Sequence, residues 1–110
     1  VAASSEKEWT MDELMEKGKT VYNTSCAACH QANGQGIPNV FPGMVGSPVT
    51  TGDIAKHIDV VVHGVSGTAM QAFGPQLNDA DLAAVITYER NAWGNDVGDT
   101  VQPSDVQAAR

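Results

Sequence analysis

The chain has 110 residues and a mass of 11.5 kDa, which is enough for one domain and too little for two separate cores. Its formal net charge is −7 and its pI about 4.6, a balance that argues against binding to nucleic acid or to an anionic membrane surface. Aromatic residues make up only 5% of the chain, and its 11 glycines add no packing volume. We therefore expect something other than side chains to fill part of the core.

The first predicted element is a helix that begins within the stretch WTMDELMEKGKTVY, residues 9–22. Thr10 is a good N-cap residue, and Glu13, three residues later, completes a capping box. Trp9 and Leu14 stand at the two positions of a hydrophobic staple. Six residues then recur at helical spacing and predict one buried face: Met11, Leu14, Met15, Gly18, Val21 and Tyr22.

Two further helices are predicted in the second half of the chain. One runs from about Asp53 to Val62, with an apolar stripe formed by Ile54, Ile58, Val61 and Val62. The other lies in LNDADLAAVITYERNAWG, with Asn78 as its N-cap and Gly94 as the residue that ends it. Its predicted buried side is lined by Leu82, Val85, Ile86, Glu89 and Trp93.

Long segments rich in glycine and proline separate these helices. They cover Gln31 to Thr51 and Gly64 to Gln76, and loops of this length are uncommon in a compact domain unless they carry function. No segment alternates apolar and polar residues as a half-buried strand does, so the predicted fold class is all-α. No apolar run approaches the roughly 20 residues of a membrane span. Residues 1–8 are expected to be a linker or a frayed N-terminus, and residues 95–110 a polar, loosely held tail.

Both cysteines of the chain lie in one motif, Cys26-Ala-Ala-Cys29-His30. A zinc site needs about four ligands, and here His57 and His63 are poorly spaced to complete one. A thioredoxin-like redox pair belongs in a βαβ context, which the sequence lacks. A disulfide across two residues closes too small a loop to stabilise much. The motif is instead typical of covalent haem attachment.

The chemistry of haem attachment explains this spacing. Two thiols that add to the two vinyl groups of one haem must lie a few ångströms apart, as they do on one turn of chain. The residue that follows, His30, then points at the iron, for which imidazole is a good ligand. A flat apolar macrocycle also supplies the missing core volume, and glycines let the backbone approach it closely.

The second axial position of the iron has several candidate ligands. Met70 stands in a glycine-flanked loop, GTAMQAFG, that can reach the opposite face of the ring, and we favour it. Met44 in FPGMVG is the second candidate. His63 is expected to face water, and His57 to be a partly buried, hydrogen-bonded structural residue. With His30 and a methionine both bound, the iron can only exchange electrons, and a thioether ligand raises the reduction potential.

A bound His30 also needs an acceptor for its other ring nitrogen. The loop GQGIPNVFP returns past this side of the predicted site. The backbone carbonyl of Pro38 is the candidate acceptor, with Pro42 behind it. Pro38 therefore joins Cys26, Cys29, His30 and Met70 as a predicted haem-site residue.

The segments GKTVYNTSCAACH, the G-x-P loop, GTAMQAFG and LNDADLAAVITYERN, taken in order, resemble a class I c-type cytochrome over residues 9–94. The resemblance implies three main helices and Gly/Pro-rich loops wrapped around one covalently bound haem c. In that family the first and last helices cross near a glycine and an aromatic residue. Gly18 and Tyr22 match the first helix of this crossing, and Val85 and Tyr88 the last.

A narrower resemblance comes from HQANGQGIPNVFPGMVGSP, GTAMQAFGPQL and VITYERNAWGN. They are similar to the cytochrome c domain fused to the C-terminus of subunit II in some bacterial haem-copper oxidases. Met44 departs from that pattern, which tends to have leucine there. The chain also lacks a copper-binding cysteine cluster, so it corresponds to the haem portion alone.

The narrower resemblance implies a domain that is not an enzyme by itself. It takes electrons from an upstream donor protein and passes them to the dinuclear copper domain of the oxidase. The other subunits of that oxidase are then its partners as well. The domain is then tethered on the periplasmic side of the bacterial inner membrane and is monomeric when isolated.

Two other functions stay open at this point. One is a free-standing soluble periplasmic cytochrome c that carries electrons. The other is a haem enzyme or gas sensor with a labile sixth ligand, which carbon monoxide binding to the reduced protein would reveal.

Overall fold

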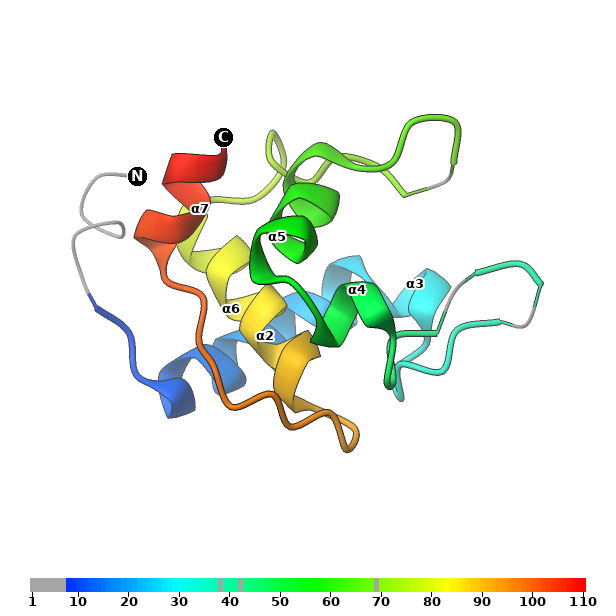
Figure 1. Cartoon of the computed structure of the whole chain (residues 1–110), viewed down its shortest axis with the longest axis horizontal. Coiled ribbons are helices and arrows are strands. Elements are labelled where there is room, and N and C mark those ends of the chain that lie inside the picture. The colour runs from blue at the N-terminus through cyan, green and yellow to red at the C-terminus, as the bar shows by residue number, and fades with distance from the viewer. Residues whose placement is uncertain (1–7, 38, 42, 69) are drawn as a thin grey trace.

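The computed structural model describes residues 8–37, 39–41, 43–68 and 70–110. Within these ranges the chain forms helices and loops, and the only β-type pairing is an isolated bridge between Ile37 and Phe41. The predicted all-α class is therefore confirmed (Figure 1). The helices are α2 (Met11–Ser25), α3 (Ala27–His30), α4 (Pro48–Thr51), α5 (Ile54–His63), α6 (Asp79–Asn91) and α7 (Pro103–Ala109). Among the described residues, no helix combines the length and apolar character needed to cross a bilayer.

Helix α2 begins at the predicted capping box. The Thr10 hydroxyl accepts a hydrogen bond from the Glu13 amide at 3.2 Å, and the Glu13 carboxylate accepts one from the Thr10 amide at 2.9 Å. This reciprocal pair satisfies two backbone donors that an uncapped helix end leaves without partners. The helix then continues to Ser25, directly before the first cysteine.

Helices α2 and α6 cross at the glycine that the sequence singled out. Gly18 is buried, and the atoms nearest to its missing side chain belong to the backbone of Ala84 and the Cβ of Tyr88. The structure thus places Ala84, rather than the predicted Val85, against Gly18, while Val85 is buried in the common core. Tyr22 and Tyr88 pack beside this crossing, with ring centroids 5.6 Å apart.

The other two predicted helices lie close to their expected positions. Helix α5 spans Ile54–His63, so it begins and ends one residue later than the predicted range of about Asp53 to Val62. Helix α6 is capped by the Asn78 side chain, which accepts from the Asp81 amide at 2.8 Å. It ends at Asn91, earlier than the predicted stop at Gly94, and Trp93 takes a positive φ of 57° just beyond it.

The C-terminal segment corrects one expectation. Residues 95–110 are not a loosely held tail, because they contain α7, which packs against α5 and α6. Val101 and Val106 are fully buried. The Gln102 amide group also exchanges hydrogen bonds with both the N–H and the C=O of Trp9, at 2.8 and 2.9 Å. This segment therefore fastens the start of α2, while residues 1–7 of the linker expected at residues 1–8 lie outside the described part of the chain.

The two long loops project from one end of the molecule. The loop that joins α3 to α4 and the loop that follows α5 both extend away from the termini along the longest axis (Figure 1). The rest of the molecule, on the side of the termini, consists of α2, α6, α7 and the body of α5. The haem motif at α3 therefore lies at the end of the molecule that carries the loops.

Candidate haem site

The Cys26–His30 motif forms a single helical turn at the end of α2. The Cys26 amide closes α2 by donating to the Tyr22 carbonyl at 2.9 Å, and the Cys26 carbonyl accepts from His30 and Cys29 at 3.0 and 3.2 Å. Both cysteines are free thiols, so no disulfide joins them. The structure thus brings together three of the predicted site residues, two thiols and one imidazole, on one turn.

The alternatives for the motif find no partners in the described ranges. No group of three or more His, Cys, Asp or Glu side chains is placed to hold a metal ion there. His57 and His63 are engaged elsewhere, because the Nε2 atom of His57 contacts Glu89 and that of His63 contacts the Ala109 carbonyl, both at 2.8 Å. No βαβ unit surrounds the cysteines in this part of the chain. These contacts engage one ring nitrogen of each histidine, and Met70 and Met44 stay the favoured candidates for the second axial ligand.

The two thiols differ in environment. Cys26 is 8% exposed, whereas Cys29 and His30 are half-buried. Burial raises the pKa of the Cys26 thiol, and the nearby carboxylate of Glu89 raises it further. Cys26 is therefore held as a neutral thiol against the α2–α6 core.

The loop after the motif is held by residues that follow α6. Trp93 donates its ring N–H to the Ala32 carbonyl at 2.9 Å. Gly34 lies against the same indole: a Cβ atom on it would come within 2.6 Å of the ring. Trp93 also packs on Tyr22, with centroids 4.8 Å apart. Sequence reasoning placed Trp93 on the helix face and missed this role.

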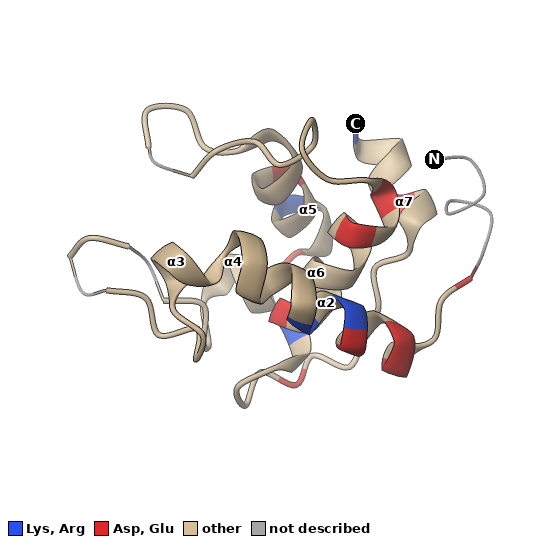
Figure 2. Cartoon of the chain, turned by 180° about the vertical axis from the view of Figure 1, so that it is seen from behind, with Lys and Arg blue, Asp and Glu red and all other residues tan. Residues whose placement is uncertain are grey.

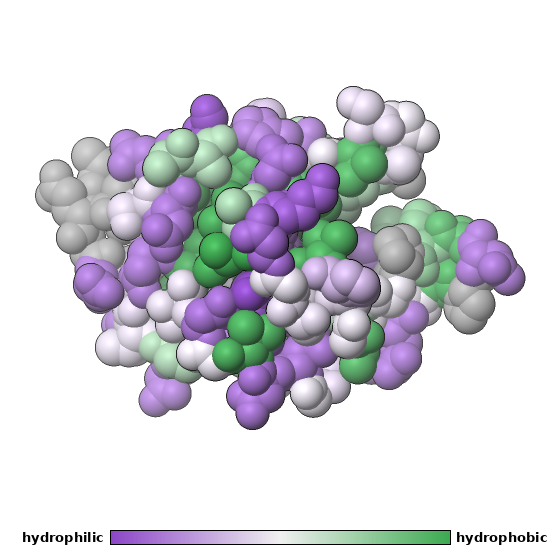
Figure 3. Space-filling model, viewed as in Figure 1, coloured by the Kyte–Doolittle hydropathy of each residue, from purple (hydrophilic) through white to green (hydrophobic). Residues whose placement is uncertain are grey.

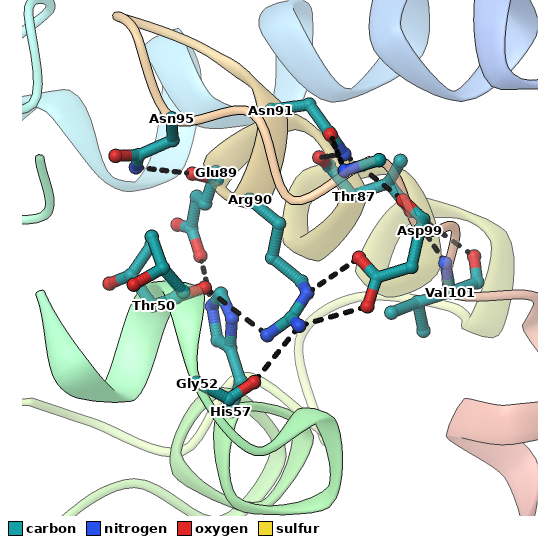
Figure 4. Close-up of polar contacts among 12 residues, drawn as sticks. Thr50, Gly52, His57, Thr87, Glu89, Arg90, Asn91, Asn95, Asp99 and Val101 are labelled. Atoms are coloured by element: carbon teal, nitrogen blue, oxygen red, sulfur yellow. Dashed lines mark hydrogen bonds and ion pairs between the residues drawn. The ribbon is translucent and has the colours of Figure 1, made fainter. Parts of the chain in front are cut away.

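Asn95 is a second, buried tether for this loop. Its side-chain amide donates to the Glu89 carbonyl at 2.9 Å (Figure 4). The same amide donates to the Met44 carbonyl at 3.0 Å, and its oxygen accepts from the Gly46 amide at 2.8 Å. Met44 itself is buried, and its amide donates to the Gly34 carbonyl at 2.6 Å. The backbone of Met44 is thus fixed on both sides.

Of the other predicted site residues, Pro38 lies outside the described part of the chain, as does Pro42. The carbonyl acceptor expected for His30 at Pro38 therefore stays a prediction. The described neighbours do return to the motif as expected, since the Gly36 amide donates to the His30 carbonyl at 2.9 Å.

Met70 lies in the loop that follows α5. Its carbonyl accepts from the Val65 amide at 3.0 Å, and its amide donates to the Thr68 hydroxyl at 3.2 Å. Gly64, with a φ of 72°, makes this fold-back possible, because a Cβ there would lie 2.8 Å from the Met70 carbonyl oxygen. The Met70 side chain is half-buried and packs against the core.

The end of the molecule that carries these loops has no formal charge on its side chains. Residues 20–52 and 64–78 contain no Asp, Glu, Lys or Arg, and Figure 2 shows the corresponding loops, α3 and α4 without either charge colour. Apolar surface is visible at this end in Figure 3. Five of the six large apolar side chains exposed among the described residues belong to these two segments: Ile37, Val40, Val45, Val49 and Val65. We call residues 20–52 and 64–78 the neutral end.

These features fit a covalently bound haem. Two free thiols stand one turn apart and an imidazole follows them, as attachment and axial ligation require. A thioether is held in a loop at the same end of the molecule. The two uncharged segments that carry them also expose apolar side chains, which suits a large apolar ring.

Comparison with known proteins gives the same assignment. The model of the family described as cytochrome c oxidase, cbb3-type, subunit III matches residues 13–88. The chain is 36% identical over 103 residues to the cytochrome c subunit of an alcohol dehydrogenase (quinone) from Gluconobacter oxydans, covering 84% of this chain and 22% of that one. It thus spans about a fifth of that relative's length.

Two further matches differ in how much of the relative they cover. Cytochrome c-552 of Thermus thermophilus is 35% identical over 94 residues, which are 71% of this chain and 69% of that protein. Among solved structures, dihydro-heme d1 dehydrogenase NirN in complex with DHE superposes with a TM-score of 0.61 at 30% identity, covering 69% of this chain and 16% of NirN.

The family model covers well over half of the chain, and the helical fold agrees with a class I cytochrome c. The chain therefore belongs to the family of cytochrome c electron-transfer domains described by the cbb3-type subunit III model, and this membership implies a covalently bound haem c.

Proposed function

We propose that this domain carries one haem c, attached through Cys26 and Cys29 and ligated by His30 and Met70, and passes electrons to the dinuclear copper centre of a bacterial haem-copper oxidase. The observation that carries the proposal is the single turn with two free thiols and an imidazole. Attachment by this motif takes place outside the cytoplasm, so we place the domain on the periplasmic side of the inner membrane.

Each side chain has a distinct task in this proposal. Cys26 and Cys29 would hold the haem through two thioether bonds, one S–H adding across each vinyl group with no atom lost. His30 would ligate the iron, with a backbone carbonyl near Pro38 as the expected partner of its second ring nitrogen. Met70 would supply a thioether as the second iron ligand.

This ligand set suits electron transfer and no other haem chemistry. When bound, the haem supplies one-electron oxidation and reduction at its iron. With His30 and Met70 both coordinated, no position remains for oxygen or a substrate. A thioether ligand also favours the reduced state and raises the potential relative to two imidazoles. The domain is then a carrier, and catalysis belongs to the complex it serves.

The tethers of the loops hold the site in place. Trp93 and Asn95 fasten the loop after the motif to the end of α6, and Gly64 lets the Met70 loop fold back on itself. A site held in this way changes little between redox states, which favours fast electron exchange. The neutral end is the surface we assign to docking of both donor and acceptor.

Support for the oxidase acceptor comes from the narrower resemblance to subunit II domains and from the family model, whose description is an oxidase subunit. A domain joined to its acceptor gains effective concentration and needs little charge steering. The alternative is a free-standing periplasmic carrier that is monomeric in solution. Its support is the cytochrome c-552 relative, of which the chain covers 69%.

The haem is tested by expressing the chain in cells that mature c-type cytochromes. We expect the mass of the denatured protein to exceed the polypeptide mass by one haem, and carbon monoxide not to bind the reduced protein at neutral pH. His30→Ala is expected to abolish stable haem incorporation. A bare polypeptide mass would refute the proposal, and rapid carbon monoxide binding would favour a gas sensor or haem enzyme.

The acceptor is tested separately by stopped-flow mixing of the reduced domain with a soluble dinuclear copper domain. We expect rapid oxidation of the haem, with the copper optical bands bleaching at the same rate. If the copper domain accepts electrons slowly while a free quinoprotein dehydrogenase reduces the domain quickly, the oxidase assignment fails and the free-standing carrier remains.

A further inference from the structure

A histidine and a glutamate face each other in the core between α5 and α6. The His57 Nε2 and Glu89 Oε1 atoms are 2.8 Å apart, and the two residues are 1% and 2% exposed. Figure 4 shows the Glu89 carboxylate pointing from α6 toward the imidazole on α5. Burying ionisable side chains is costly unless they are paired, and nothing in the proposed ligand set uses this pair.

The His57–Glu89 pair has room for one more proton. Nε2–H donates to the carboxylate when the imidazole is neutral, and the other ring nitrogen, Nδ1, is buried with no hydrogen-bond partner. In this state the pair carries one negative charge. A proton bound at Nδ1 makes the pair neutral overall, with an imidazolium beside a carboxylate.

The pair is linked to the haem attachment point by helix packing, because α6, which carries Glu89, packs on α2, which ends directly before Cys26. Glu89 raises the pKa of the buried Cys26 thiol and of Tyr22, both on the α2 side of α6. The Glu89 backbone is further tied through Asn95 to the loop that carries Met44. In the low dielectric of a core, charges at such sites interact far more strongly than on a surface.

We propose that the His57–Glu89 pair takes up one proton when the domain is reduced and releases it when the domain is oxidised. The inference rests on the proposed haem at Cys26 and Cys29. One electron arrives from the donor protein and one proton from water, and both leave on oxidation, so charge and atoms balance. The added electron removes one positive charge from the site, and the proton on the pair replaces it.

Linkage makes this coupling reciprocal. If reduction favours the protonated pair, protonation of the pair must favour reduction. The reduction potential then falls as pH rises, by up to about 59 mV for each tenfold fall in proton concentration in a one-electron couple. The reduced domain would therefore be a stronger electron donor at higher pH.

Other charged groups near the pair do not account for this effect. Arg90 is buried beside it but stays charged, held by Asp99 and by the carbonyls of Thr50 and Gly52 (Figure 4). Helix α4 has no ionisable side chain, and Cys26 no longer titrates once it is a thioether. On α2 and α6 the facing tyrosines, Tyr22 and Tyr88, both have raised pKa values.

Charged side chains on the outer faces of α5 and α7 are exposed or paired. At the N-cap and along helix α5 they are Asp53, Lys56 and Asp59, which are exposed, as is Asp105 on α7, while Arg110 is paired with Asp79. The haem propionates can also titrate, and they are present in every variant compared below.

The test is the reduction potential of the haem-loaded protein, measured by optical redox titration from about pH 4 to about pH 9, which brackets ordinary carboxyl and imidazole titration. The wild type is expected to show a falling potential across part of this range. The double variant His57→Leu/Glu89→Leu replaces the pair with apolar side chains, so it leaves no unpaired buried charge and is expected to fold. Its potential should keep only the slope that the propionates give.

A matched control is His63→Gln, which removes an exposed histidine from the same helix and should keep the wild-type slope. Infrared difference spectra between redox states provide an independent readout, in which Glu89→Gln should remove a carboxyl band. Equal slopes in the wild type and the double variant would overturn the inference while leaving the haem intact. A protein that binds no haem would instead refute the proposed function.

Discussion

A Cβ atom on Gly18 of α2 would lie 2.6 Å from the Cβ of Tyr88 on α6, and closer still to the Ala84 carbonyl oxygen. Real Cβ atoms do not approach backbone this closely, so the two helices are in contact through their backbones at this point. The crossing sets the angle at which α2 delivers Cys26 to the site.

Gly18→Ala is therefore expected to destabilise the domain. In an exposed helix interior, replacing glycine with alanine raises the free energy of unfolding by up to about 1 kcal/mol, but overpacking a tight contact lowers it by about 1–3 kcal/mol. Because the neighbour at the crossing is backbone, we expect overpacking to outweigh the gain. The free energy of unfolding measured in urea should therefore fall. Lys19→Ala, on the exposed next position, should change stability by less than about 0.5 kcal/mol. A more stable Gly18→Ala protein would contradict the crossing.

Met70→Ala is expected to open the sixth coordination position. The potential should fall by tens to hundreds of millivolts, a part of the about 0.8 V range that axial ligands set, and carbon monoxide should then bind the reduced protein. Optical spectra and redox titration measure both effects. Met44→Leu is the matched control, since Met44 is a buried side chain whose backbone is fixed by Gly34 and Asn95. If the Met44 variant changes and the Met70 variant does not, the ligand assignment is reversed.

Tyr22 makes the fold sensitive to alkali. Its hydroxyl donates to the Gln31 carbonyl at 2.6 Å, and burial, followed by the charge of Glu89, raises its pKa above the usual value of about 10. Above about pH 10 the unfolded chain loses this proton while the folded chain keeps it, so stability falls as pH rises.

In Tyr22→Phe, stability should fall less steeply with rising pH. The measurement is the urea concentration at the midpoint of unfolding, taken from neutral pH upward. At neutral pH it should cost about 1 kcal/mol for the missing hydrogen bond. Tyr88→Phe is the comparison, because the Tyr88 hydroxyl is less buried and a hydrogen bond with Trp93 opposes the rise of its pKa. An unchanged alkaline slope in Tyr22→Phe would show that the tyrosine does not stay protonated in the fold.

The neutral end predicts weak salt dependence of electron transfer. Exposed charges steer partners over distances that salt screens, and residues 20–52 and 64–78 have none. Val40→Glu places a charge on the most exposed large apolar residue there, at 64% exposure, and should slow electron transfer to the copper domain several-fold. Val97→Glu, exposed but outside the neutral end, should leave the rate unchanged. Equal effects would place the docking surface elsewhere.

The parts of the fold that could be predicted are those specified by residues close together in the chain. The capping box of Thr10 and Glu13 gave the start of α2, and Asn78 gave the start of α6. The haem motif was recognisable because two thiols and an imidazole must share one turn. The end of α6 was misplaced because Trp93, although apolar and at helical spacing, leaves the helix to cover Gly34.

Helix α7 was missed although local signals for it exist. Pro103 stands at the first helical position, and Gln102 and Asp105 form a capping box. Only Val101 and Val106 are clearly apolar in this stretch, so no periodic stripe predicted burial. Their burial depends on a surface supplied by α5 and α6, which the sequence of the segment itself does not reveal.

The His57–Glu89 pair also could not be predicted from local sequence patterns. Glu89 fell on the predicted buried side of α6, and His57 at the edge of the α5 stripe, but the two are 32 positions apart. Only the packing of α5 on α6 brings them within hydrogen-bond distance. Short-range patterns therefore placed the thiols, the imidazole and the methionine loop, and tertiary contact decided what surrounds them.

Asn95 and Trp93 have a consequence for the order in which the protein is assembled. The loop that covers the haem motif is fastened by side chains 49 to 61 positions further along the chain. The two cysteines therefore stay accessible until Trp93 and Asn95 have docked on the loop. Enzymes that install the prosthetic group can reach the thiols in the unfolded chain, and docking of these two side chains then covers the finished thioether bonds.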